Sequence, residues 1–216
     1  MSRINQIGWT LVLVSSLSAV RNVVFWVLCL GIALVSWRFL VASVEMTMPT
    51  VAYHAHLRPI AFYAHVGLAP IALALVPFQL WRGLRDERRA IHRLLGRLYG
   101  VAVVLSGLGG LWLAMTTTSG PIASSGFALL AVLWVATTIM GIGSAMAGNL
   151  ANHRAWMTRS IALTLAAVTL RLYLPLSMLT GLPFDAAYTA IAWLCWVPNL
   201  IVAELVLNRR RRLVAA

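Results

Sequence analysis

Six long apolar segments constrain this sequence more than any other feature. Each has about 20 residues, which lets a helix rising 1.5 Å per residue cross roughly 30 Å of hydrocarbon. The segments are Val23–Val41, Ile60–Leu80, Leu94–Met115, Ile122–Ala147, Ser160–Thr180 and Tyr188–Leu207. Hydrocarbon offers the backbone no hydrogen-bond partner, so such segments joined by short polar turns predict helices. We expect an all-α, polytopic membrane bundle of six transmembrane helices, with residues 1–216 forming one transmembrane domain.

The composition and the cysteines agree with a lipid environment. Hydrophobic residues make up 61% of the chain and charged residues 10%, a balance that favours the bilayer over water. Cys29 and Cys195 each lie inside an apolar segment, where we expect packing roles and no disulfide. A full-length apolar segment follows Arg21 at once. We therefore interpret residues 1–22 as an uncleaved interfacial N-terminal segment and not as a signal peptide.

The distribution of arginine predicts the orientation. All 17 basic residues are Arg, and 14 of them fall on one side of the six-helix topology. The positive-inside rule places that side, with both chain ends, in the cytoplasm, and it places the protein in the cytoplasmic membrane. Basic residues at the ends of apolar segments meet lipid headgroups, so we expect no nucleic-acid partner.

Two arginines lie within the predicted spans and need a separate explanation. Arg38 is near the outer end of its helix, so its side chain can extend to the membrane surface. Arg171 lies about 18 Å of helix beyond Arg159, too deep for easy access to the cytoplasmic headgroups. A charge at that depth is costly, and we therefore interpret Arg171 as functional.

The remaining polar residues form two layers when the helical period is combined with the topology. A period of 3.6 residues predicts that one face of the fifth span carries His153, Met157, Ser160, Thr164, Ala167 and Arg171. The cytoplasmic layer then contains Gln79, His92 and His153. The outer layer contains His65 and Arg171, and the outer loop adds Glu45, His54, His56 and Arg58.

The histidine layers suggest b-type haem, because axial imidazoles must come from separate helices to hold a flat macrocycle. Our leading hypothesis is a haem b-binding redox protein with His92 and His153 as iron ligands and Gln79 at the same cofactor site. Arg97 or Arg159 would neutralise the propionates. The outer pair, His65 and Arg171, would bind a second haem, a quinone or an anionic substrate.

Three other interpretations remain open. In the first, His92 and His153 are interfacial anchors that bind no cofactor, as is common for a His followed by Arg at a helix end. In the second, the protein is a non-redox transporter or small-molecule binding protein, in which Arg171 binds an anion and His65 relays protons. A membrane scaffold without turnover is the third interpretation.

The outer loop suggests a metal site as well. It contains two thioethers and two imidazoles, a ligand set that suits copper: Met46, Met48, His54 and His56. The chain has neither a phosphate-binding Gly-rich loop nor a zinc-protease helix motif. With five acidic residues, a paired-carboxylate active site is not expected.

Two segments, His65–Leu113 and His153–Leu172, resemble the domain-of-unknown-function 2306 family of predicted bacterial membrane proteins. The resemblance rests on Pro77-Phe78-Gln79, on His92-Arg93-Leu94-Leu95-Gly96-Arg97-Leu98-Tyr99, and on His153-Arg154-Ala155-Trp156-Met157-Thr158-Arg159 followed by Arg171. It implies a fold but no settled activity.

The His-Arg-x-x-Gly opening of the third span is similar, more distantly, to b-type cytochromes and ferric-reductase-like membrane domains. That similarity implies haem binding and transmembrane electron transfer, with His92 as the best-matched ligand. In the outer layer His65 has no partner inside a span. His54 or His56 would serve only if their loop folds back into the bundle.

Overall fold

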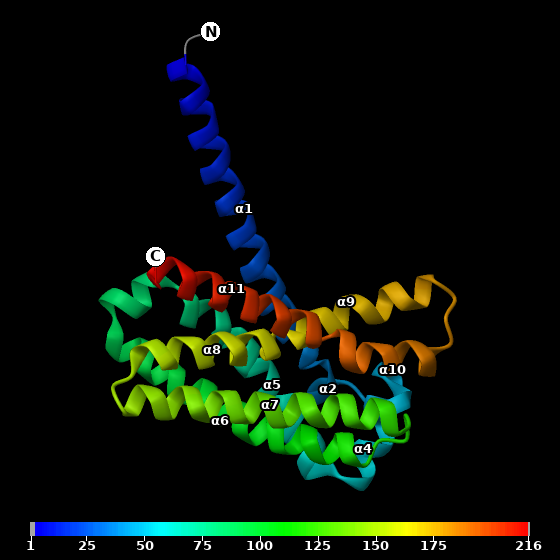
Figure 1. The fold of residues 1–216 in the computed structure, drawn as a ribbon. Helices are drawn as coiled ribbons and strands as arrows, with labels where there is room; N and C mark the ends of the chain where they lie inside the picture. The colour runs from blue at the N-terminus through cyan, green and yellow to red at the C-terminus, as the bar shows by residue number, and fades with distance from the viewer. Residues whose placement is uncertain (1–2, 216) are drawn as a thin grey trace.

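The structure is a computed structural model that describes the backbone of residues 3–215 and the side chains of residues 18–213. Every regular element in this part of the chain is a helix (Figure 1). In chain order they are α1 (Arg3–Ser36), α2 (Arg38–Val41), α3 (Val44–Thr47), the 3-10 helix η1 (Pro49–Val51), α4 (Ala52–Leu57), α5 (Pro59–Leu80), the π-helix η2 (Gly83–Glu87), α6 (Arg89–Met115), α7 (Pro121–Met146), α8 (Leu150–Thr164), α9 (Ala166–Leu179), α10 (Phe184–Leu194) and α11 (Val197–Ala215).

Six stretches of the described chain are long and apolar enough to cross a membrane. They are Ser18–Val41, Pro59–Leu80, Arg89–Met115, Pro121–Met146, Leu150–Leu179 and Phe184–Leu213. The predicted all-α bundle with six membrane helices is therefore confirmed. The interfacial segment predicted for residues 1–22 falls mostly on residues whose side chains lie outside the described part of the chain.

Two of these stretches consist of two helices each, with a local break between them. Pro198 has no N–H and its ring crowds the carbonyl of Leu194, four residues earlier, so α10 ends and α11 begins there. At this junction the carbonyl of Cys195 accepts hydrogen bonds from Thr169 Oγ1 and Asn199 Nδ2. Between α8 and α9 the hydroxyl of Thr164 bonds back to the carbonyl four residues before it, a contact that bends helices.

The turn between α7 and α8 shows how short the connections are. Gly148 has a φ of 75°, a conformation that glycine adopts without strain. This lets the N–H groups of Gly148 and Asn149 bond back to the carbonyls of Ala145 and Ser144, which completes a Schellman motif. The side chain of Asn149 then caps α8 by accepting from Asn152 N at 3.0 Å. The two helices therefore lie antiparallel and in contact.

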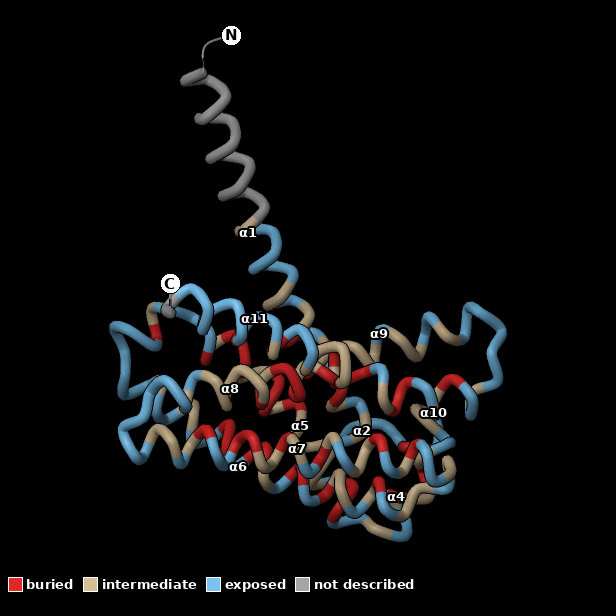
Figure 2. Tube along the Cα trace, viewed as in Figure 1, coloured by how far each residue is buried: buried red, intermediate tan, exposed pale blue. Residues whose placement is uncertain are grey.

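The bundle is apolar on its outer surface, and its interior combines apolar and small side chains with a few polar ones. On α6 the side chains of Val101, Leu105, Leu108 and Trp112 are exposed at helical spacing, as expected of a lipid-facing stripe. The opposite face of α6 packs Tyr99 and other side chains into a core shared with α5, α7, α8 and α9 (Figure 2). Cys29 and Cys195 are buried free thiols in the same core, in agreement with the sequence.

Helix α1 packs against α5 through its C-terminal part, whereas Ala19–Val24 are exposed and the helix extends away from the bundle (Figure 1). The rings of Trp26 and Phe78 meet edge to face with centroids 4.8 Å apart, and Trp37 Nε1 donates to the carbonyl of Gly67 at 3.1 Å. At the other side of the bundle Arg159 forms two hydrogen bonds to the carboxylate of Glu204 and stacks over Trp156. These contacts hold α1 against α5 and α11 against α8.

The two ends of the bundle differ in charge. η2, the α7–α8 turn and the last turns of α11 lie at one end, which we call the Arg-rich end (Figure 1). α3, η1, α4 and the α6–α7 and α9–α10 turns lie at the opposite end, which we call the Arg-poor end. The polar layers are described relative to these two ends.

Candidate functional site

A cavity of about 300 Å³ opens among the helices in the half of the bundle toward the Arg-poor end. Its walls come from the last residue of α1, from α5 to α10, and from the short helices between Arg38 and Leu57. Most of the lining is apolar and includes Leu73, Trp134 and Leu170. The cavity therefore suits a largely apolar molecule. The few polar side chains of the lining determine which polar groups that molecule can have.

Two guanidinium groups line this cavity. Arg171 reaches it from α9, and its Nη1 donates to the carbonyl of Ala167 at 3.1 Å. Arg38 reaches it from α2 and stacks on the Phe39 ring, with 5.0 Å between the guanidinium carbon and the ring centroid. None of the described residues that line the cavity is acidic, and no carboxylate in the described part of the chain pairs with either arginine. The cavity therefore carries an uncompensated positive charge.

His65 lines the same cavity from α5. Its Nδ1 lies 2.9 Å from the carbonyl oxygen of Ser106, and a carbonyl only accepts, so Nδ1 carries the proton and Nε2 is the free acceptor. The ring occupies the space beside Gly110, where an added Cβ would lie 2.8 Å from Nδ1. Gly110 thus makes room for the imidazole, and the Ser106 carbonyl fixes its tautomer. The predicted outer layer of His65 and Arg171 is brought together on one cavity.

His54 joins the cavity from α4, because the loop that carries it folds back over the end of the bundle. Val44, Ala52 and Phe62 form a small buried cluster beneath this loop. Tyr53 accepts a hydrogen bond from the N–H of Thr118 at 3.0 Å, which ties α4 to the α6–α7 turn. His54 is 6% exposed and its Nδ1 has no partner. We call residues Val44–Leu57 the cap of the cavity.

Burial, and secondly the charge of Arg58, lower the pKa of His54 from 6.5 to about 4. The folded cap therefore holds a neutral imidazole at pH 7. A depressed histidine pKa contributes stability that is present above pH 6.5 and is lost as the pH falls toward 4, since the opened cap binds the extra proton. At pH 5 the loss is about 2 kcal/mol.

Lowering the pH from 7.5 to 5 is accordingly expected to reduce the hydrogen-exchange protection of the α4 amides about thirtyfold, after correction for intrinsic exchange rates. His54→Leu is expected to abolish this pH dependence, whereas His56→Leu, two residues away and exposed, is expected to retain it. Equal pH dependence in wild type and His54→Leu would show that the buried imidazole does not control the cap.

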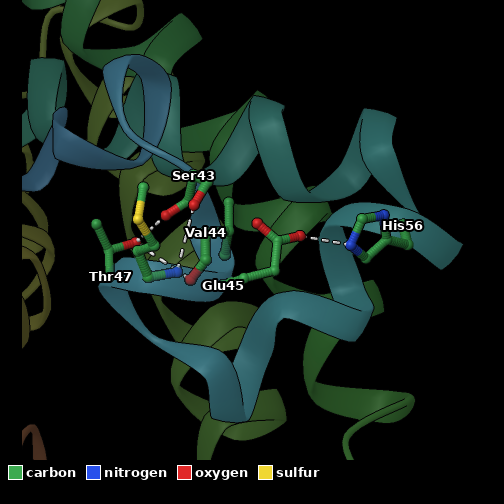
Figure 3. A network of polar contacts seen from close by, with 6 residues as sticks. Ser43, Val44, Glu45, Thr47 and His56 are labelled. Atoms are coloured by element: carbon green, nitrogen blue, oxygen red, sulfur yellow. Dashed lines mark hydrogen bonds and ion pairs between the residues drawn. The ribbon is translucent and has the colours of Figure 1, made fainter.

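The exposed side of the cap has a separate hydrogen-bonded pair. His56 Nε2 donates to Glu45 Oε1 at 2.6 Å, across eleven residues of the cap (Figure 3). Ser43 accepts from the N–H of Met46 and begins α3 in the same network. A hydrogen bond from its own backbone, followed by the bond from His56, lowers the pKa of Glu45. The pair therefore braces the cap on its solvent side.

The four residues of the predicted copper site are divided between these two surfaces. Met48 and His54 line the cavity, while His56 pairs with Glu45 and Met46 is 81% exposed. Copper would also share the cavity with two guanidinium groups, which repel a cation. The copper site stays a prediction, and this charge distribution opposes it.

The second predicted layer lies at the Arg-rich end. His153 Nδ1 donates to the carbonyl of Gly141 at 2.8 Å, which leaves Nε2 as its acceptor. His92 is close enough for its charge to interact with that of His153, and its buried Nδ1 has no partner. Gln79 bonds to the backbone carbonyl of His92 at 3.3 Å. Gln79 thus lies beside the first turn of α6, and Arg159, which we expected to neutralise a propionate, instead bonds to Glu204.

These features define a class: a polytopic integral membrane protein that gathers its polar side chains in the interior of a helical bundle. The chain belongs to the DUF2306 family of predicted membrane proteins, whose family model matches residues 62–207. No curated protein and no solved structure matches the chain. The family resemblance seen in the sequence is confirmed, whereas the more distant likeness to b-type cytochromes has no support from these comparisons.

The matched region contains part of the cavity and omits the rest. His65 and Arg171 lie within residues 62–207, while Arg38 and His54 precede them. Sequence reasoning gave Arg38 only a surface role, although its position inside an apolar segment was a usable signal. The sequence identifies His54 as a candidate ligand, but its burial depends on the fold of the cap, which the sequence pattern does not predict.

Proposed function

We propose that this protein is a non-redox membrane protein that binds a small amphiphilic organic anion in the cavity. The proposal rests on one observation: Arg171 and Arg38 line a cavity whose described lining has no acidic residue. Arg38 is exposed, but Arg171 is partly buried, and an unpaired charge there is expensive, a cost that an anionic ligand would repay. The orientation predicted from arginine, with the Arg-rich end in the cytoplasm, would place the site in the outer half of the membrane.

The rest of the lining indicates what the anion is attached to. Apart from the two arginines and two histidines, the cavity surface is mainly aliphatic and aromatic. His65 offers an acceptor nitrogen, so a protonated or hydroxyl-bearing group on the ligand would find a partner there. An apolar body with one sulfonate, phosphate or carboxylate end fits this pattern.

The test is calorimetric titration of the full-length protein in detergent with benzenesulfonate and phenyl phosphate, and with methyl phenyl sulfone as a neutral compound of similar shape. We expect both anions to bind at least tenfold more tightly than the sulfone. Mass spectrometry of the purified protein gives a second arm. A retained acidic lipid displaced by benzenesulfonate would identify the bilayer as the ligand source. Equal binding of anion and sulfone, with no retained acidic lipid, would show the proposal to be wrong.

Haem b is the second candidate, favoured by the way two imidazoles are held. In both His65 and His153 a backbone carbonyl holds Nδ1, which leaves Nε2 free, as is usual for axial ligands. At the Arg-rich end His92 and His153 come from different helices, α6 and α8, so this donor set fits a bis-imidazole site. Haem would supply one-electron transfer there, while Gln79 would position the first turn of α6 through the His92 carbonyl.

A reduced-minus-oxidised visible spectrum of protein expressed with haem supply separates the two candidates. A Soret and α-band that disappear in His153→Leu, and persist in Arg171→Gln, would favour haem at the Arg-rich end. A spectrum without these bands would exclude haem and leave the anion proposal standing.

A further inference from the structure

A chain of hydroxyl groups runs through the centre of the bundle beside the cavity. Tyr99 of α6 bonds through its hydroxyl to Ser160 Oγ at 2.7 Å and to Thr164 Oγ1 at 2.6 Å. Thr138 of α7 bonds to Ser160 Oγ at 2.7 Å, and Trp134 Nε1 donates to Thr164 Oγ1 at 2.8 Å. Tyr99, Ser160 and Thr138 are completely buried. Three helices thus contribute to one continuous polar network.

The network can be hydrogen-bonded in two directions. In one, Thr138 donates to Ser160, Ser160 to Tyr99, Tyr99 to Thr164, and Thr164 to the backbone carbonyl of Ser160. In the other, Thr164 donates to Tyr99, Tyr99 to Ser160, Ser160 to Thr138, and Thr138 to the carbonyl of Trp134. Both arrangements use every hydroxyl proton in this chain. A row of hydroxyls can pass a proton along it when its hydrogen bonds can all be made in either direction, and this row meets that condition.

The two ends of the network meet the two polar layers. At one end Thr164 and Trp134 line the cavity that contains His65 and Arg171. At the other end Thr138 lies three residues from Gly141, whose carbonyl accepts a hydrogen bond from His153 Nδ1. Three residues of α-helix rise about 4.5 Å, a gap that one bridging water would span. The polar groups therefore extend from the Arg-rich end to the cavity.

We propose that this network carries protons between the His92 and His153 pair and the cavity, so that anion movement through the protein is coupled to proton movement. This inference rests on the proposed anion site. An imidazolium at the Arg-rich end gives its proton to the bridging water, which releases one of its own protons to Thr138. Each hydroxyl accepts one proton and releases its own to the next. The Thr164 hydroxyl turns from the Ser160 carbonyl toward the cavity and delivers one proton to His65 Nε2. The hydroxyls then rotate back, and the charge on each is unchanged.

The experiment uses full-length protein in vesicles of phosphatidylcholine and phosphatidylglycerol that contain pyranine. Benzenesulfonate is the added anion because it stays ionised and carries no proton across the bilayer itself. Uptake of labelled benzenesulfonate and the pH of the lumen are recorded together. We expect uptake to acidify the lumen in wild type, and both signals to fall at least tenfold in Tyr99→Phe, while binding in detergent stays within threefold.

A matched pair guards against simple loss of packing. Thr138→Val removes a network hydroxyl, whereas Thr137→Val removes a buried neighbour that bonds only to backbone carbonyls. The first is expected to lose coupled acidification and the second to keep it. Binding without proton movement in wild type, or full acidification in Tyr99→Phe, would overturn the proton path and leave the anion site intact. Absence of benzenesulfonate binding in detergent would instead refute the site itself.

Discussion

Replacing Arg171 with glutamine is expected to weaken benzenesulfonate binding about thirtyfold, measured by calorimetry in detergent. Arg171 is the deeper of the two cationic groups on the cavity, and its one hydrogen bond to the protein goes to a backbone carbonyl. A hydrogen bond between charged groups contributes about 2 kcal/mol net of the bonds to water that it replaces, and this free energy corresponds to a thirtyfold change in affinity. Glutamine keeps a donor in the cavity but loses the charge.

The same substitution is expected to leave the ligand-free protein as stable as wild type, or to raise its melting temperature. Arg171 lacks a carboxylate partner in the described part of the chain, so its removal takes away a desolvated charge and breaks no ion pair. Weaker binding together with undiminished stability is the signature of a ligand-binding residue. Arg154→Gln is the control, because Arg154 is exposed on α8 near the Arg-rich end. Loss of stability with unchanged binding would make Arg171 a structural residue.

The helical parts of this arrangement were predictable, and the cap was not. A period of 3.6 residues places Ser160, Thr164 and Arg171 on one face, and the structure turns Ser160 and Thr164 into the core and Arg171 onto the cavity. Because α5 and α9 run in opposite directions through the same layers, His65 could be matched to Arg171 by depth alone. Backbone period and membrane thickness fix these positions without knowledge of side-chain contacts.

Loops obey no such period, and this explains what sequence reasoning missed. His54 and His56 are separated by one residue, yet one faces the cavity and the other pairs with Glu45. Their different surroundings depend on how Ala52 and Val44 pack on Phe62. These contacts join separate segments of the chain, and no periodic pattern in the sequence predicts them. Arg38 is exposed, as expected of an arginine near the outer end of its helix, and its additional position on the cavity depends on the fold of the cap.

Substituting Gly109 with alanine is expected to destabilise the protein by about 2 kcal/mol, measured as a lower melting temperature in detergent. A Cβ on Gly109 would lie 2.6 Å from the carbonyl oxygen of Ala61 and 3.4 Å from the N–H nitrogen of His65. These are backbone atoms of α5, which move only if the whole helix moves. The close approach of α5 to α6 therefore depends on glycine at this position.

Gly67→Ala is the matched control, because a Cβ at Gly67, also on α5, meets nothing within 4 Å. Alanine favours the helix over glycine by up to about 1 kcal/mol, so this variant is expected to be neutral or stabilised. Separation of α5 from α6 in Gly109→Ala would also displace His65 from the Ser106 carbonyl, so benzenesulfonate binding should fall as well. If both alanine variants melt at the same temperature, α5 and α6 are not packed as closely as the structure shows, and the cavity between them loses its fixed shape.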